Sequence, residues 1–230
     1  MINFTLIQTN LVAMAKLKIK ELFFSVIGNK INTDHGYKLY SALKAKVLDR
    51  NPGILQKNNF PVDVNISRIS GKDYKYGTLI TNKSKLKIRG PSDYLAELKK
   101  VLNEQVISIG NTKIFIYEAT ILSLFPETSL VSEIVIIKYP FWQAINSQER
   151  FLASCKKQLS ALNINQEPLL LENTLCDSVK QKIMTIKKDS CKTTYIGYGV
   201  RIDNLSNQAS IALKIQGIGG KRHMGCGWFE

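Results

Sequence analysis

The residues best suited to chemistry lie in one glycine-rich segment, 217–227. A glycine-hydrophobic-glycine triplet occurs at Gly217–Gly219 and again at Gly225–Gly227, with five residues between the two. Four of these five could contact a ligand: Gly220, Lys221, Arg222 and His223. Glycine permits positive φ and a close backbone approach to a ligand, and peptide N–H groups beside fixed positive charge bind anions. The segment therefore predicts a loop that holds a phosphate backbone.

Two familiar phosphate-binding loops do not fit this segment. A dinucleotide-binding fingerprint requires a third glycine where Arg222 stands. A Walker-type loop requires glycine at Ile215 and serine or threonine at Arg222. The structural alternative is a glycine-rich hairpin that closes a sheet, although a plain turn needs no Lys-Arg-His cluster.

The composition indicates a globular protein with a polyanionic partner. The 230 residues carry 32 Lys and Arg against 18 Asp and Glu, a formal net charge of +14. Such an excess indicates nucleic acid first and an anionic membrane second. No apolar run approaches the roughly 20 residues that cross a bilayer, so we expect no membrane-spanning segment. Of the two kinds of polyanion we expect nucleic acid as the partner and no membrane.

The four cysteines are scattered, which suits a reducing compartment better than a disulfide framework. His223 and Cys226 alone do not make a zinc site, so we expect no metal and no cofactor. Residues 1–15 lack the basic start of a signal peptide. We interpret them as an N-terminal extension of a cytoplasmic protein.

The elements that must position the loop form a repeating order. Hydrophobic periodicity predicts strand 17–27, helix 37–48 after Asp34-His35-Gly36, strands 62–69, 76–81 and 86–89, a helix from Pro91 and strand 113–125. Strand 130–139 follows, then a helix whose capping box is Asn146 and Glu149, strands 180–188 and 195–202, helix 206–215 and strand 226–229.

Two successive βαββαβ units predict an α+β fold of two tandem ferredoxin-like, RRM-like domains. We place the first domain at 16–127 and the second at 128–230, with loop 217–227 in the second. Sheets of this kind leave a face and a cleft that suit single strands and hairpins of RNA.

The duplicated order and the repeated glycine triplets resemble the repeat-associated (RAMP) superfamily of CRISPR proteins. Within it, Asp34-His35-Gly36-Tyr37-Lys38-Leu39-Tyr40-Ser41 together with the 217–227 loop is similar to the repeat-RNA-processing endoribonucleases of the Cas-six family. Within that family, the sequence most resembles the myxobacterial and cyanobacterial branch. The resemblance spans about 16–229. The chain departs from that branch at position 223, where the branch more usually has a basic or variable residue and this chain has His223.

The resemblance implies metal-independent cleavage of precursor CRISPR RNA within each repeat. A ribose 2′-hydroxyl attacks its own 3′-phosphate and leaves a 2′,3′-cyclic phosphate and a 5′-hydroxyl. Histidine serves as acid or base near neutral pH, and His35 matches the catalytic position of the family. Tyr37 and Ser41 are expected to help. The 217–227 loop is expected to bind the RNA through seven glycines and cations and one histidine: Gly217, Gly219, Gly220, Lys221, Arg222, His223, Gly225 and Gly227.

The partners implied are repeat RNA, its guide-RNA stem-loop and other Cascade subunits. Whether the parent system is defensive or serves CRISPR-associated transposition stays open at this stage. So does the choice between His35 and His223 as the main acid or base. The main alternative is a non-catalytic RAMP subunit that binds guide RNA in an effector complex. A general RNA-recognition module is a further alternative, but aromatic residues such as Phe115 and Tyr117 are too thinly spaced for it.

Overall fold

The computed structural model describes residues 18–74, 77–137, 147–173, 176–179, 181–188 and 191–230. Several predictions fall outside these ranges. They are the extension 1–15, the first residues of strands 17–27, 76–81 and 180–188, the last residues of strand 130–139, and Asn146 of the predicted capping box.

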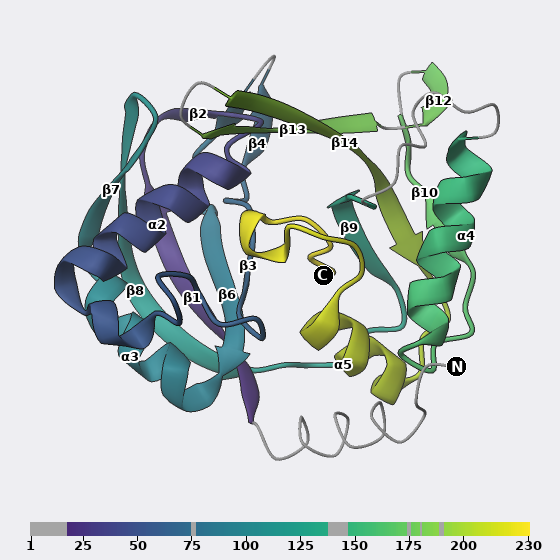
Figure 1. The fold of residues 1–230 in the computed structure, drawn as a ribbon, viewed down its shortest axis with the longest axis horizontal. Helices are drawn as coiled ribbons and strands as arrows, with labels where there is room; N and C mark the ends of the chain where they lie inside the picture. The colour runs from purple at the N-terminus through teal and green to yellow at the C-terminus, as the bar shows by residue number, and fades with distance from the viewer. Residues whose placement is uncertain (1–17, 75–76, 138–146, 174–175, 180, 189–190) are drawn as a thin grey trace.

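The N-terminal half is a five-stranded antiparallel sheet with two helices on one face (Figure 1). Its order is β3-β6-β1-β8-β7, where the strands are β1 (Ile19–Ile27), β3 (Asn65–Ile66), β6 (Lys85–Pro91), β7 (Gln105–Ile109) and β8 (Thr112–Ser123). The helices are α2 (Gly36–Arg50) and α3 (Ser92–Leu102). Strand β1 lies between β6 and β8, as a βαββαβ unit requires.

Hydrophobic alternation explains why these elements pack as they do. Leu22, Phe24 and Val26 of β1 are buried against the helices because alternate residues of a strand share a face. Leu39, Leu43 and Val47 of α2 recur every four residues and are buried in the same cluster. Small strands β2 (Lys30–Asn32), β4 (Lys72–Tyr74) and β5 (Gly77–Leu79), with 3-10 turn η1 (Pro52–Ile54), complete this half.

The C-terminal half is built around the long strand β14 (Cys191–Ile202). It pairs with β13 (Gln181–Lys188) over residues 191–198, and with β9 (Leu130–Val135) and β10 (Pro168–Leu170) near its end. The remaining elements are β11 (Glu172–Asn173), β12 (Cys176–Val179), α4 (Ser147–Ser160), α5 (Asn207–Gln216) and η3 (Arg222–Met224). A second hydrophobic cluster, from Leu130 to Phe229, lies within this half.

The predicted strand 226–229 is wrong as a regular strand. Gly225 and Gly227 have φ of 78° and 64°, which interrupts extended geometry. The tail nevertheless runs beside β9. Gly227 N–H donates to Ile134 O at 2.8 Å, and Glu230 and Val131 exchange two backbone hydrogen bonds at 2.9 and 3.0 Å. Residues 226–230 thus take the place of the fourth strand of the second βαββαβ unit.

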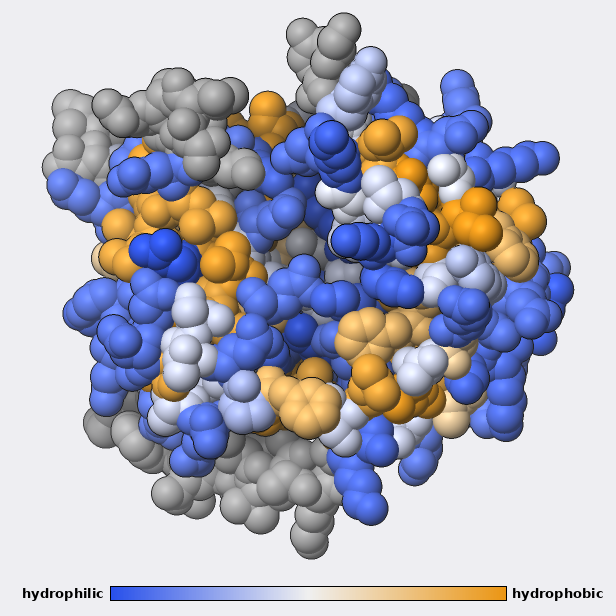
Figure 2. All heavy atoms as spheres, turned by 180° about the vertical axis from the view of Figure 1, so that it is seen from behind, coloured by the Kyte–Doolittle hydropathy of each residue, from blue (hydrophilic) through white to orange (hydrophobic). Residues whose placement is uncertain are grey.

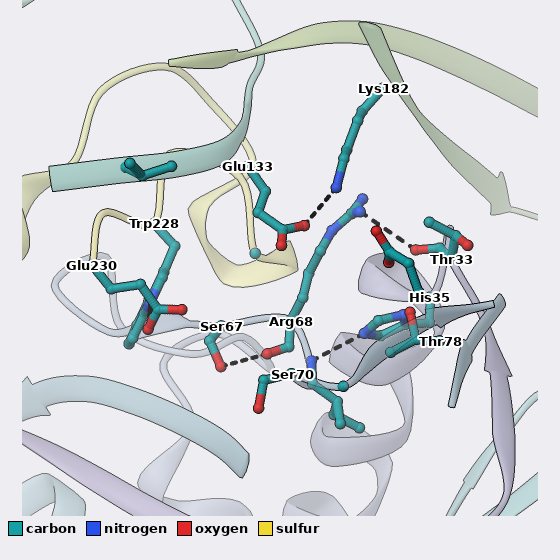
Figure 3. Close-up of a pocket in the computed structure, with 15 residues that line it drawn as sticks. Thr33, His35, Ser67, Arg68, Ser70, Thr78, Glu133, Lys182, Trp228 and Glu230 are labelled. Atoms are coloured by element: carbon teal, nitrogen blue, oxygen red, sulfur yellow. Dashed lines mark hydrogen bonds and ion pairs between the residues drawn. The ribbon is translucent and has the colours of Figure 1, made fainter. Parts of the chain in front are cut away.

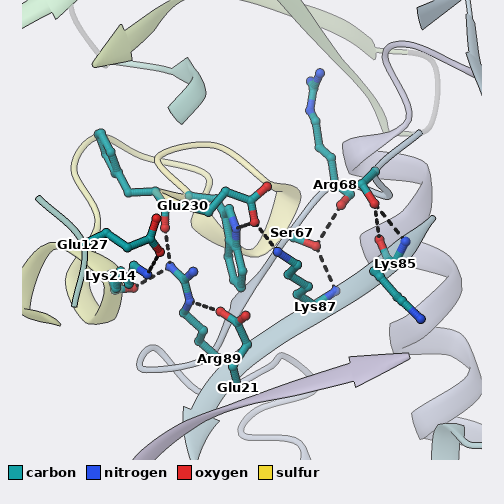
Figure 4. Close-up of polar contacts among 12 residues, drawn as sticks. Glu21, Ser67, Arg68, Lys85, Lys87, Arg89, Glu127, Lys214 and Glu230 are labelled. Carbon is teal, nitrogen blue, oxygen red and sulfur yellow. Dashed lines mark hydrogen bonds and ion pairs between the residues drawn. The ribbon is translucent and has the colours of Figure 1, made fainter. Parts of the chain in front are cut away.

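The predicted strand 62–69 is mostly wrong, because only Asn65–Ile66 has regular pairing with β6. Beyond it, serine hydroxyls replace backbone carbonyls as acceptors for β6. Lys87 N–H donates to Ser67 Oγ at 2.9 Å, and Lys85 N–H donates to Ser70 Oγ at 2.8 Å (Figure 4). The segment between these serines leaves the sheet.

The α+β class with two tandem ferredoxin-like halves is confirmed. No helix in the described ranges is long and apolar enough to cross a membrane.

Candidate active site between the two halves

A cavity of about 300 Å³ lies where the two halves meet (Figure 3). Thr33, His35 and Arg68 line it from the N-terminal half, and Glu133, Lys182 and Gly225 line it from the C-terminal half. Seen from behind, the molecule is hollowed at its centre and hydrophilic side chains surround the hollow (Figure 2). The cavity therefore combines histidine, arginine and lysine from segments far apart in the sequence.

The Asp34-His35-Gly36 motif connects the two halves. Asp34 Oδ2 accepts a hydrogen bond from Thr185 N–H of β13 at 2.7 Å. Gly36 is the first residue of α2, and a Cβ atom there would lie 2.2 Å from Met224 O in the glycine loop. The motif thus holds both β13 and the loop against the start of α2.

His35 is buried, with both ring nitrogens hydrogen-bonded to backbone. Its side chain is 2% exposed. Nε2 accepts from Ile69 N–H at 3.0 Å, which leaves Nδ1 to donate to Asn32 O at 2.8 Å. Burial, with the nearby charge of Arg68, lowers the pKa of His35 from 6.5 to about 4. His35 is therefore neutral at pH 7, in one tautomer.

This shifted pKa makes folding sensitive to acid. As pH falls from 6.5 to 4, unfolded His35 takes up a proton and folded His35 does not, so the free energy of unfolding decreases. We expect His35 alone to account for a loss of up to about 3 kcal/mol between pH 7 and pH 4. Urea unfolding across this pH range, compared with His35→Gln, measures it. Identical pH dependence in the two proteins would contradict the prediction.

The two predicted helpers do not reach this cavity. Tyr37 and Ser41 are half-buried on α2 and are not among the described residues that line it. The Tyr37 ring lies 6.5 Å from that of Tyr40. Their catalytic role stays a prediction.

The backbone N–H groups of the glycine loop are used inside the protein. Gly219 donates to Gln158 Oε1 at 2.7 Å. The amides of the other four glycines donate to backbone carbonyl oxygens: Gly217 to Leu213, Gly220 to Ile136, Gly225 to Arg222 and Gly227 to Ile134. These amides are therefore engaged in this conformation. RNA contact by the loop, still a prediction, depends on its side chains and on close approach to its backbone.

The loop's cationic side chains differ in exposure to a ligand. Arg222 Nη1 donates to Gln216 O, and His223 Nε2 donates to Pro61 O at 3.0 Å. Burial lowers the pKa of both groups. Lys221 Nζ lies 5.0 Å from the centre of the Tyr195 ring. His223 thus holds the loop against the N-terminal half, whereas Lys221 is the loop cation without a backbone acceptor among the described contacts.

Gly36→Ala is expected to loosen the contact between α2 and the loop. The added Cβ overlaps Met224 O, a backbone atom that cannot move alone, and such overpacking costs about 1–3 kcal/mol. Urea unfolding checks this. Gly53→Ala is the matched control, since its Cβ meets its nearest atom at 3.5 Å, an ordinary contact. Equal stability of the two variants would contradict the expected clash.

Sequence reasoning missed Arg68 as a cavity residue, and it considered the lysines of 180–188 as RNA contacts without singling out Lys182. A signal for Arg68 exists, because it continues the alternation of Val62, Val64 and Ile66 on the face predicted to be apolar. A charge at an apolar position is costly unless it has a partner or a function. In the described ranges no group of three or more His, Cys, Asp or Glu could hold a metal ion.

The family model described as Cas6 Crispr matches residues 21–230. The chain belongs to the Cas6 family. A curated relative, the CRISPR-associated endonuclease Cas6 of Myxococcus xanthus (strain DK1622), is 23% identical over 209 residues. The match covers 91% of this chain and 80% of the relative.

Solved structures of the Cas6 family share the fold. A structure titled "CRISPR associated protein Cas6" matches with a TM-score of 0.60 at 16% identity, covering 92% of this chain and 98% of the other. A Cas6-related protein from Pyrococcus furiosus has the same TM-score and coverage at 13% identity. One titled "An RAMP protein binding different RNA substrates" reaches 0.62 at 12% identity, again covering 92% and 98%.

Proposed function

We propose that this Cas6 protein is a metal-independent endoribonuclease that cleaves precursor CRISPR RNA within its repeats. The observation that carries the proposal is the convergence of His35, Arg68 and Lys182 on one cavity between the halves. Membership of the Cas6 family and the name of the Myxococcus relative support it. The net charge of +14 suits an RNA substrate.

The reaction needs a base for the 2′-hydroxyl, an acid for the leaving 5′-oxygen and positive charge for the phosphorane. We assign proton transfer to His35. Its Nε2 is the nitrogen held by Ile69 N–H, so bound RNA has to replace that hydrogen bond before Nε2 exchanges a proton. A neutral imidazole at pH 7 starts as the base that accepts the 2′-hydroxyl proton, and the imidazolium formed can then donate to the leaving oxygen.

The test is cleavage of the cognate repeat RNA in the presence of EDTA. We expect products with a 2′,3′-cyclic phosphate and a 5′-hydroxyl, and no cleavage when a 2′-deoxy nucleotide stands at the cut position. Cleavage that EDTA abolishes would contradict the metal-independent mechanism. We further propose that the protein stays bound to the repeat stem-loop and joins a Cascade-type complex, which co-purification from cells with labelled guide RNA would test.

A second candidate is a RAMP subunit that binds guide RNA without cleaving it. The observation that favours it is that both His35 nitrogens already have backbone partners. Tight binding of repeat RNA with no cleavage under any condition of pH would support this candidate over the endoribonuclease.

A further inference from the structure

Arg68 lines the cavity, and its guanidinium is incompletely hydrogen-bonded. Within the described part of the chain, its Nε and Nη2 atoms are buried and have no hydrogen-bond partner. Nη1 is 3.4 Å from Thr33 O, a weak contact. A buried donor without an acceptor costs free energy, so a group that the protein does not itself supply is the expected acceptor.

The fold is built to hold Arg68 in this position. Ser67 and Ser70 hydroxyls accept the β6 amide hydrogens, so the two residues between them leave the sheet (Figure 4). Because residue 69 lies outside the sheet, Ile69 N–H does not pair with β6 and instead donates to His35 Nε2. His35 therefore fixes the segment from which the arginine side chain extends.

The glycine loop leaves room for the same side chain. A Cβ at Gly225 would lie 2.5 Å from Arg68 Cγ and 2.8 Å from Arg68 N, and Gly225 has a φ of 78°. Only glycine fits such a position without strain. Gly225, the first glycine of the second triplet, thus packs against Arg68.

The charges around the cavity leave Arg68 as the cation without a carboxylate. Lys182 Nζ pairs with Glu133 at 2.6 Å. Glu230, also in the lining, pairs with Lys87 at 2.5 Å. The third lining carboxylate, Asp73, belongs to β4, whose residues are exposed. In the described ranges no ion pair joins a carboxylate to Arg68.

We propose that Arg68 binds one phosphodiester group of the RNA in this cavity, through Nε and Nη2, which have to be uncovered as the RNA enters because both atoms are buried in this conformation. Guanidinium presents two parallel N–H donors that match two phosphate oxygens. A volume of about 300 Å³ is at the lower end for small-ligand pockets and suits one phosphate with its ester groups, not a duplex. Arg68 then places the scissile phosphate beside His35 and stabilises the charge of the phosphorane, an assignment that rests on the proposed function.

The first test uses inorganic phosphate at constant ionic strength and does not depend on cleavage. We expect saturating phosphate to raise the melting temperature of the wild-type protein by about 2–4 °C and to leave Arg68→Gln unchanged. Arg50→Gln, at the exposed end of α2, is the matched control and should respond like wild type. An equal shift in all three proteins, or none in any, would overturn the site.

The second test uses repeat RNA. We expect Arg68→Gln to slow single-turnover cleavage about 100-fold or more, with Arg68→Lys in between. Affinity for a 2′-deoxy, uncleavable repeat should change only a few-fold, because one phosphate contact among many is lost. Arg68→Gln cleaving at the wild-type rate would refute the assignment while leaving the proposed function intact.

The same variant separates a ligand-binding arginine from a structural one. A structural arginine loses stability when it is replaced, whereas one with unsatisfied buried donors does not. We expect Arg68→Gln to melt at or above the wild-type temperature without phosphate. A clear loss of stability would count against the site. If wild type fails to cleave RNA but binds phosphate through Arg68, the proposed function fails and the site stands.

Discussion

His35→Gln is expected to abolish RNA cleavage while leaving the fold intact at pH 7. Glutamine offers an amide oxygen at about the reach of Nε2, so it retains an acceptor for Ile69 N–H, but it does not titrate. Loss of a general acid or base typically costs 10²–10⁴-fold in rate. We therefore expect about 100-fold slower single-turnover cleavage or worse, with unchanged affinity for an uncleavable repeat.

The comparison with His35→Ala makes this result decisive. Alanine removes both ring hydrogen bonds and leaves the buried Ile69 N–H without its acceptor, so it loses stability as well as cleavage. If glutamine restores the cleavage that alanine abolishes, His35 is a positioning residue for the 67–70 segment and transfers no proton. His223→Gln should lose far less activity, because His223 contacts Pro61 O and Tyr40 outside the cavity lining.

Arg89→Ala is expected to cause the largest loss of stability. Arg89 is 2% exposed and pairs with Glu21, which is 5% exposed. Its Nη1 donates to Lys214 O and Phe229 O at 3.0 and 2.8 Å, and the guanidinium lies 3.8 Å from the Trp228 ring centre (Figure 4). Alanine leaves the Glu21 carboxylate buried without its partner, at a cost of about 3–5 kcal/mol.

Urea unfolding measures the effect against a matched arginine. Arg201 pairs with Asp203 at 3.0 Å with a side chain that is 49% exposed, and such surface pairs contribute about 0–1 kcal/mol. Arg201→Ala should therefore be nearly neutral. Replacing both partners, Arg89→Met with Glu21→Met, should recover much of the loss. Equal stability of the two single variants would show that Arg89 does not hold the halves together.

Hydrophobic periodicity predicted most of the fold. Helix 37–48 is observed as Gly36–Arg50, and strand 17–27 as Ile19–Ile27. Two predicted strands, 62–69 and 226–229, are wrong for local causes that periodicity does not contain, and strands β7 and β10 were not predicted. Serine hydroxyls replace the carbonyl acceptors in the first, and positive φ at two glycines breaks the second.

The site was less predictable than the fold. Resemblance identified the Asp34-His35-Gly36 motif, but its contacts with Thr185, Ile69 and Met224 are tertiary. The glycine triplets indicated a phosphate cradle, whereas their amides bond to the protein and Gly225 makes room for Arg68. Sequence spacing cannot show which amides are already paired.

The contact between Gly36 and Met224 means that the cavity forms later in synthesis than the first sheet. Every strand of the first sheet lies within 19–123, with its own hydrophobic cluster, and such units fold as they leave the ribosome. The cavity forms only after about a hundred more residues have been synthesised, when Met224 and Gly225 emerge and pack on Gly36 and Arg68. A nascent chain therefore has a folded, cationic first half before its candidate site is assembled.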